Sequence, residues 1–199
     1  MTTSLLDRRP IVVAVAGPNG AGKTTFYCSH LQAAGLRLVN ADIIARELDV
    51  DPYEAAHVAA AVRRELVRQG ESFAFETVFS DPAGDKLSFL KETAVGGYTV
   101  LLCFIGLSSP ELSGERVAMR VSQGGHDVPH EKLMARFPRT LANLAAAIRE
   151  LPHVWIFDNS DLDRPFRLLS VCENGIAGLR PPVPKWLQPL LPSASSKGL

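Results

Sequence analysis

Short apolar runs alternate with segments of helical periodicity along most of this chain. Five runs of mainly apolar residues have the length and composition of buried strands. They are residues 11–16, 36–39, 72–79, 98–105 and 154–157. The segments between them carry apolar residues three and four positions apart, which predicts amphipathic helices. Strands that alternate with helices in this way predict an α/β fold, in which right-handed crossovers join a parallel sheet covered by helices on both faces.

Capping residues and prolines place the ends of the expected helices. Asp51-Pro52 and Asp81-Pro82 have the form of a helix cap followed by a proline in the first turn, and Gly35 is a helix stop. Pro138 should kink the last long helix or divide it in two. The expected helices cover about residues 25–34, 43–48, 51–70, 81–95, 110–121 and 130–151.

The carboxyl-terminal part of the chain is less regular. Residues 166–172 predict a sixth strand at an edge of the sheet, and Glu-Asn-Gly at 173–175 predicts a turn after it. The prolines that follow predict a tail over residues 181–199, with one short helix around Trp186 and Leu187 and disorder in the last seven residues. The length of 199 residues favours a single domain, which we place at residues 1–180.

One polar interruption of this pattern has a specific chemical meaning. Directly after the first strand, Gly17-Pro18-Asn19-Gly20-Ala21-Gly22-Lys23-Thr24 has the form G-x-x-x-x-G-K-T, between a strand and a helix as a phosphate-binding loop requires. Its glycines would let backbone N–H groups face phosphate oxygens, Lys23 would contact the β- and γ-phosphates of a nucleotide, and Thr24 would bind Mg²⁺. Thr25 would pack the helix or make a further phosphate contact. The motif predicts a three-layer P-loop NTPase sandwich, with the nucleoside-kinase strand order 2-3-1-4-5.

Composition bears on the other classes of partner. Lysine and arginine balance aspartate and glutamate at a formal net charge of zero, so the bulk composition gives no indication of binding to nucleic acid or to an anionic membrane. The three cysteines lack metal-binding or C-x-x-C spacing, and no stretch has the form of a signal peptide or a membrane span. We therefore expect a cytoplasmic protein.

Acidic and hydroxyl side chains follow three of the expected strands. Asp42 follows the second strand, Glu76 and Thr77 end the third, and Asp158-Asn159-Ser160 follows the fifth. Ligands bind beyond the carboxyl ends of parallel strands, so these residues are expected beside the phosphate loop. Asp42 is a candidate to take the proton from an attacking hydroxyl, or to cap a helix. Glu76 and Thr77 are candidates to hold the acceptor, the alternative for Glu76 being an ion pair with an arginine. Asn159 and Ser160 would contact the purine base or form a polar turn.

A glycine-rich polar stretch at residues 122–129 separates two expected helices, and it is typical of a mobile lid, which we place at about residues 108–130. Arg116 and Arg120 project from one face of the helix before it and are candidates to neutralise the transferred γ-phosphoryl group. A solvated helix face is the alternative. His126 in the stretch would touch phosphate or substrate, or be an ordinary surface residue.

Taken in order, these residues resemble the zeta toxin family of P-loop kinases. The resemblance extends over roughly residues 11–160 and rests on an ordered set of short motifs. They are Ala16–Thr25, Val39–Asp42, Phe75–Ser80, Gly97-Tyr98, Arg116–Val121, Gly124–Pro129 and Asp158–Ser160. The resemblance implies a kinase that uses ATP or GTP with Mg²⁺ and phosphorylates a sugar nucleotide. Toxin members of the family phosphorylate a hydroxyl of UDP-N-acetylglucosamine.

The resemblance also implies roles for individual residues. In the family an acid after the second strand is the general base, which matches Asp42, and a glutamate at the end of the third strand binds the sugar, which matches Glu76. Two arginines near the lid stabilise the transferred phosphoryl group. Arg116 or Arg120 matches the first of these arginines. Toxin members place the second arginine nearer to the following helix, and here His126 or Arg120 would replace it.

Other functions and partners stay open at this stage. One alternative is a kinase that phosphorylates a different alcohol, such as a simple sugar, an antibiotic or a nucleic-acid end. A nucleotide-binding switch held inactive by a partner would need no acceptor, and the acids would then be structural. An antitoxin protein is a further partner that the family suggests and that no surface feature of the sequence indicates.

Overall fold

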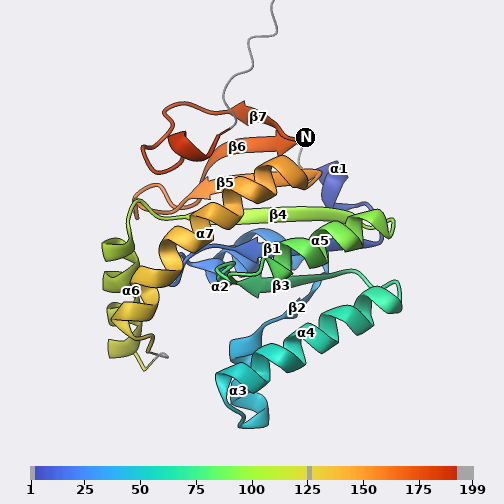
Figure 1. Ribbon diagram of the computed structural model, residues 1–199, viewed down its shortest axis with the longest axis horizontal. Helices are drawn as coiled ribbons and strands as arrows, with labels where there is room; N and C mark the ends of the chain where they lie inside the picture. The colour runs from blue at the N-terminus through green and yellow to red at the C-terminus, as the bar shows by residue number, and fades with distance from the viewer. Residues whose placement is uncertain (1–2, 125–126, 192–199) are drawn as a thin grey trace, which may run out of the picture.

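The apolar runs form the centre of a mixed sheet in the computed structural model, which describes residues 3–124 and 127–191 (Figure 1). β1 (Ile11–Ala16) lies between β3 (Phe73–Thr77) and β4 (Thr99–Gly106), β2 (Arg37–Val39) pairs with β3, and β5 (His153–Asp158) pairs with β4. These five strands are parallel. All of β1 and all but the first residue of β4 are buried, because helices cover both faces. The predicted order 2-3-1-4-5 is confirmed.

Two antiparallel strands extend the sheet beyond β5. β6 (Arg167–Glu173) pairs with β5 at the place predicted for an edge strand, and β7 (Ile176–Leu179) pairs with β6. Asn174 and Gly175 reverse the chain between them with φ values of 49° and 81°. The sheet is therefore mixed rather than wholly parallel. The prediction that the sixth strand lies at an edge is wrong, because β7, a strand that the sequence pattern did not predict, forms the edge on this side.

Helices lie on both faces of the sheet (Figure 1). On one face, α4 (Pro52–Arg68), α5 (Asp85–Val95) and the carboxyl-terminal half of α7 (His130–Glu150) bury apolar side chains against the strands. α1 (Thr3–Leu6) and α2 (Lys23–Phe26) pack on the opposite face. The predicted three-layer arrangement is thus confirmed.

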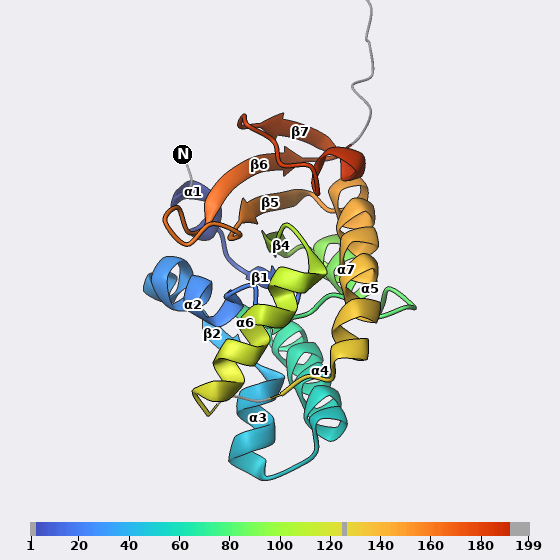
Figure 2. The same cartoon turned by 90° about the vertical axis from the view of Figure 1, so that its left-hand side faces the viewer.

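The remaining helical segments continue these layers or stand at their ends. α2 passes into a π-helical turn, η1 (Tyr27–Leu31), and a 3-10 turn, η2 (Gln32–Ala34), which together fill the range predicted for one helix. α3 (Ala41–Leu48) precedes α4, and α6 (Pro110–Ser122) follows β4. Both α3 and α6 lie toward the carboxyl ends of the parallel strands (Figure 2).

Two predictions about helix limits are wrong. The helix expected from Asp81 begins at Asp85, after Gly84 adopts a left-handed conformation with φ of 73°. Asp81 instead closes a turn, in which its carboxylate accepts a hydrogen bond from the N–H of Lys86 at 3.3 Å. Pro138 does not divide α7, which runs unbroken from His130 to Glu150, so that part of the prediction is wrong, and the alternative of a kink stays a prediction. Pro138 is exposed and removes only one backbone donor from a long helix.

The described part of the expected tail packs on the sheet. Trp186 and Leu187 are buried, and the ring of Trp186 lies 6.3 Å from that of Phe104 in β4. The short helix predicted there is a 3-10 turn, η3 (Gln188–Leu190), which begins one residue later. The domain boundary at residue 180 stays a prediction, and the last seven residues lie outside the described part. Over residues 3–124 and 127–191, no helix has the length and hydropathy needed to cross a membrane.

Candidate phosphate-binding and catalytic site

The carboxyl ends of the central strands lie at one level. Ala16 of β1 pairs with Thr77 of β3 and with Phe104 of β4, and Gly106 of β4 pairs with Asp158 of β5. The loop after β1 and the polar residues after β2, β3 and β5 therefore meet at one edge of the sheet, where α/β proteins bind ligands. Figure 2 views the molecule from this side, with α6 crossing in front of the sheet.

The loop after β1 needs glycine at its two ends. Gly17 has φ of 147°, and a Cβ atom there would lie 2.2 Å from the carbonyl oxygen of Ile105 in β4. Gly22 has φ of 86° and stands immediately before the first residue of α2, Lys23. Side chains at these two positions would clash or strain the backbone, so the glycines allow the tight passage from strand to helix that the motif predicts.

Lys23 folds back over the loop. Its ammonium group donates hydrogen bonds to the carbonyl oxygens of Gly17, at 3.0 Å, and Pro18, at 2.9 Å. The ammonium group thus lies inside the curve of the loop, within reach of an anion that the loop would hold.

Three of the predicted site residues act electrostatically on a fourth, Lys23. Burial lowers the pKa of Lys23 to about 8, the negative charges of Glu76 and Asp42 oppose this shift, and the positive charge of Arg120 adds to it. The structure therefore brings together Lys23, Glu76, Asp42 and Arg120, which come from four different elements.

Glu76 connects the end of β3 to the loop. Its Oε2 atom accepts a hydrogen bond from the hydroxyl of Thr24 at 3.1 Å. Burial raises the pKa of Glu76, while Lys23, Thr24 and Asn40 favour its charged form. The other oxygen, Oε1, is buried and accepts no hydrogen bond within the described residues. A buried carboxylate oxygen without a donor is unfavourable, so it is suited to a ligand that carries one.

Asn40, not Asp42, caps α3. The Oδ1 atom of Asn40 accepts hydrogen bonds from the N–H groups of Asp42, at 2.8 Å, and Ile43, at 3.4 Å. The alternative role considered for Asp42, that of a helix cap, is therefore wrong. Asp42 lies in the first turn of α3 with an exposed side chain, and its charge acts on Lys23 and Glu76.

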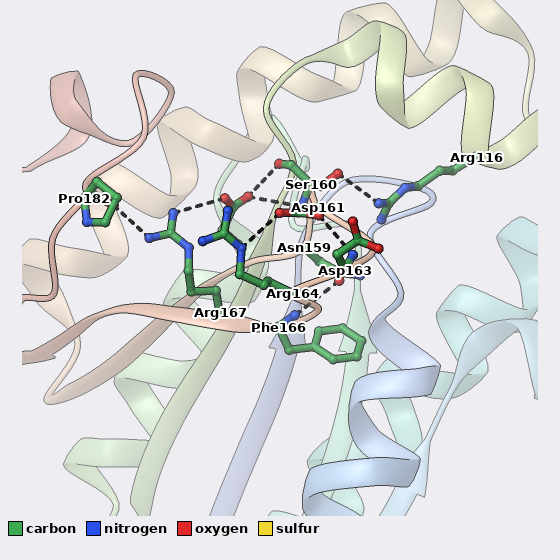
Figure 3. A network of polar contacts seen from close by, with 10 residues as sticks. Arg116, Asn159, Ser160, Asp161, Asp163, Arg164, Phe166, Arg167 and Pro182 are labelled. Atoms are coloured by element: carbon green, nitrogen blue, oxygen red, sulfur yellow. Dashed lines mark hydrogen bonds and ion pairs between the residues drawn. The ribbon is translucent and has the colours of Figure 1, made fainter.

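The other candidates differ in how closely they approach this group. The hydroxyl of Thr77 accepts a hydrogen bond from the N–H of Phe79 at 3.0 Å, which turns the chain after β3. Thr25 is exposed on α2. The guanidinium group of Arg116 donates to the carbonyl oxygen of Ser160 at 3.3 Å (Figure 3), and burial lowers its pKa. His126 lies outside the described residues.

Two residues near the loop have roles that the sequence did not predict. Asn159, considered for contact with a base, donates its side-chain N–H to the carbonyl oxygen of Ala21 at 2.9 Å. Ser113 in α6 donates its hydroxyl to the carbonyl oxygen of Asn19 at 2.6 Å. No sequence motif marks Ser113, because its contact spans 94 residues of chain.

A depression of about 610 Å³ lies elsewhere, at the amino ends of the strands. Arg8, Tyr98, Arg149 and His153 are among the residues that line it. The depression and the phosphate loop lie at opposite ends of the parallel strands. We place the candidate site at the loop and not in the depression.

Comparison with known proteins decides the family. The family model described as zeta toxin matches residues 46–165, more than half of the chain. The chain belongs to the zeta toxin family. In this zeta toxin family protein the match takes in Glu76, Arg116 and Arg120, whereas the phosphate loop and Asp42 precede it.

Solved structures share the fold at low sequence identity. The crystal structure of AvrRxo1-ORF1:-ORF2 with ATP matches with a TM-score of 0.68 and 19% identity, over 87% of this chain and 61% of that chain. The PezAT toxin-antitoxin system of Streptococcus pneumoniae matches with a TM-score of 0.58 and 16% identity, over 79% of this chain and 71% of that chain. A structure described as a putative kinase from Chloroflexus aurantiacus matches with a TM-score of 0.52 and 20% identity, over 66% of this chain and 80% of that chain.

These likenesses establish the P-loop kinase fold of this zeta toxin family protein and nothing finer. The chain spans only 61% of the length of the AvrRxo1 chain that it matches. A comparison with curated protein sequences finds no match.

Proposed function

We propose that this protein is a kinase that transfers the γ-phosphoryl group of ATP to a hydroxyl of a sugar nucleotide such as UDP-N-acetylglucosamine. One observation carries the proposal: a phosphate-type loop with Lys23 and Thr24 faces two carboxylates, Asp42 and Glu76, at one edge of the sheet. The loop suits the nucleotide, and the acids suit a hydroxyl acceptor. The test is transfer of the γ-phosphoryl group to that hydroxyl in a reaction that requires Lys23.

The phosphate loop, residues 17–25, is the proposed nucleotide site. Bound phosphate oxygens would replace the carbonyl groups of Gly17 and Pro18 as partners of the Lys23 ammonium group. We propose ATP rather than GTP, because the AvrRxo1 structure of the same fold was solved with ATP.

The oxygen donors beside the loop fit Mg²⁺. The Thr24 hydroxyl is a direct ligand of the kind this ion takes, and the buried Oε1 atom of Glu76 is suited to accept a hydrogen bond from a water molecule on the ion. When bound, Mg²⁺ neutralises charge on the β- and γ-phosphate oxygens.

Asp42 and the residues around it would prepare the acceptor. As the acceptor oxygen bonds to the γ-phosphorus, its proton passes to the carboxylate of Asp42, and the bond from the γ-phosphorus to the bridging oxygen of ADP breaks. Glu76 and Thr77 hold the acceptor beside this carboxylate. Lys23 with Arg116 or Arg120 balances the negative charge on the group in transfer.

The family suggests a sugar nucleotide and a protein partner. UDP-N-acetylglucosamine is the acceptor that the zeta toxin family implies, and PezAT is described as a toxin-antitoxin system. We therefore extend the proposal to an antitoxin protein that holds the kinase inactive. We place the reaction in the cytoplasm, where ATP is available.

Affinity for ATP is expected to fall above about pH 8. The ligand-free pKa of Lys23 is about 8, below its ordinary value of 10.5, so Lys23 carries its charge below pH 8 and loses it above. Binding phosphate restores the charge, which means that ATP binding above pH 8 takes up a proton. By linkage, the dissociation constant should rise by up to about tenfold per pH unit above that value.

Isothermal titration calorimetry between pH 7 and 9.5 measures this dependence. The Lys23→Met variant should bind ATP weakly at every pH and without the rise above pH 8, because it has no proton to lose. A wild-type dissociation constant that stays level from pH 7.5 to 9.5 would show that Lys23 does not meet the phosphates.

A further inference from the structure

Two buried side chains hold carbonyl groups of the phosphate loop from outside. Ser113 donates its hydroxyl to the carbonyl oxygen of Asn19 at 2.6 Å, and Asn159 donates its side-chain N–H to the carbonyl oxygen of Ala21 at 2.9 Å. Ser113 is 2% exposed and Asn159 is 6% exposed, so water competes little for either bond. The two residues come from α6 and from the chain after β5, and they hold two different carbonyl groups of the loop.

Fixing a carbonyl group also fixes the direction of the N–H group in the same peptide bond. In a trans peptide the C=O and N–H bonds point in opposite directions. When Ser113 fixes the carbonyl group of Asn19, the N–H group of Gly20 must therefore point away from α6. In the same way, Asn159 turns the N–H group of Gly22 away from the β5 side and toward the inside of the loop.

Asn159 is itself held in a single orientation. Its own N–H donates to the carbonyl oxygen of Gly106 at 3.0 Å, and its Oδ1 atom accepts a hydrogen bond from the N–H of Phe166 at 3.2 Å (Figure 3). Because Oδ1 faces a donor, the amide nitrogen must face Ala21. The Phe166 ring packs edge-on at 5.4 Å against Phe26 of α2, which fixes this corner against the helix that follows the loop.

The two supports are also joined to each other. Arg116 lies one turn after Ser113 in α6, and its guanidinium group donates to the carbonyl oxygen of Ser160, the residue after Asn159 (Figure 3). The packing at Gly20 is close, since a Cβ atom there would lie 3.0 Å from the Cβ of Arg116. The loop is thus enclosed between α6 and the chain after β5, and its backbone has little freedom to rotate.

We propose that Asn159 and Ser113 are positioning residues for nucleotide binding. They preset the N–H groups of Gly22 and Gly20 to face the β-phosphate, so that binding does not have to turn the peptide planes first. This inference rests on the proposed use of ATP. It assigns Asn159 to the loop backbone and not to contact with a base.

The test compares the affinities of ADP and AMP in the Asn159→Asp variant. This substitution keeps the shape of the side chain and its acceptor for Phe166, but it places an oxygen where Ala21 needs a donor. AMP lacks the β-phosphate that the loop would hold. The dissociation constant of ADP should rise about 10- to 100-fold, the effect of disturbing hydrogen bonds to a charged group, while that of AMP should change less than about threefold.

A second variant and a matched control complete the experiment. Ser113→Ala removes one hydroxyl and should raise the dissociation constant of ADP, but not that of AMP, by about three- to tenfold. This variant provides the test if Asn159→Asp does not fold. Asn143 of α7 also donates its side-chain amide to backbone carbonyl oxygens, those of Phe79 at 3.0 Å and Asp81 at 3.1 Å. Asn143→Asp should lower the melting temperature without changing the ratio of the ADP and AMP constants.

The outcomes separate this inference from the function on which it rests. A wild-type protein that does not bind ADP would overturn both. If the wild type binds ADP, and the folded Asn159→Asp or Ser113→Ala variant keeps the wild-type ratio of the ADP and AMP dissociation constants, the inference alone is overturned. An equal loss of ADP and AMP binding in these variants would show a general structural effect and overturn the inference too. A change in the ratio of the two dissociation constants in Asn143→Asp as well would have the same meaning.

Discussion

Replacing Asp42 by asparagine is expected to lower the rate of phosphoryl transfer by about 10²- to 10⁴-fold, the usual contribution of a general base. The dissociation constant for ATP should stay within about twofold of the wild-type value, because the amide has the shape of the acid and Asn40 still caps α3. Asp42 also supports the charge of Lys23, so the comparison belongs at pH 7, below the Lys23 pKa of about 8.

Single-turnover transfer from γ-labelled ATP and calorimetric ATP binding measure the two quantities. Glu47→Gln is the matched control, since Glu47 is an exposed acid in the same helix. Wild-type turnover in Asp42→Asn would remove Asp42 from the mechanism. An equal fall in Glu47→Gln would assign the loss to α3 as a whole.

Replacing Gly17 by alanine is expected to destabilise the fold by at least about 3 kcal/mol, in the range of severe core and backbone substitutions. The added Cβ atom would lie 2.2 Å from the carbonyl oxygen of Ile105, at a φ of 147° that alanine rarely adopts. Relief requires β1 and β4 to separate where they are paired and buried. For a chain of this length, the loss corresponds to a fall in melting temperature of roughly 6–12 °C.

Thermal unfolding followed by circular dichroism measures this fall. Gly35→Ala is the control, because Gly35 also has a positive φ, 67°, but has no atom within 4 Å of the Cβ position. It should cost only the strain of a left-handed residue, about 1–2 kcal/mol. Equal effects at the two positions would mean that the contact with Ile105 is not what requires glycine.

The features predicted best from the sequence are those that local pattern determines. The apolar runs that became β1 and β4 are continuous because both faces of these strands are covered, and a phosphate loop is recognisable because glycine, lysine and threonine recur at fixed spacing. Asp42 and Glu76 were placed beside the loop correctly, because parallel strands must bring their carboxyl ends to one edge.

What the sequence did not reveal depends on contacts between distant residues. β7 has four residues, one of them Gly178, and it becomes a strand only because β6 offers it a free edge. Asp81 and Pro82 have the local form of a helix start, yet Asp81 forms a turn, and the amide of Asn143 in α7 holds its carbonyl oxygen. From the sequence only Asp42 was considered as a cap, but asparagine caps helices as well as aspartate does, and the backbone geometry shows that Asn40 is the cap of α3.

Transfer of label from γ-labelled ATP into a panel of sugar nucleotides, with Mg²⁺ and with Lys23→Ala as the control, tests the central claim most directly. The account predicts label in UDP-N-acetylglucosamine with the wild-type protein and none with Lys23→Ala. Label in a simple sugar or an antibiotic added to the panel would keep the kinase and change its acceptor. Label that passes only to water, whichever hydroxyl compound is present, would contradict the claim and favour a nucleotide-dependent switch.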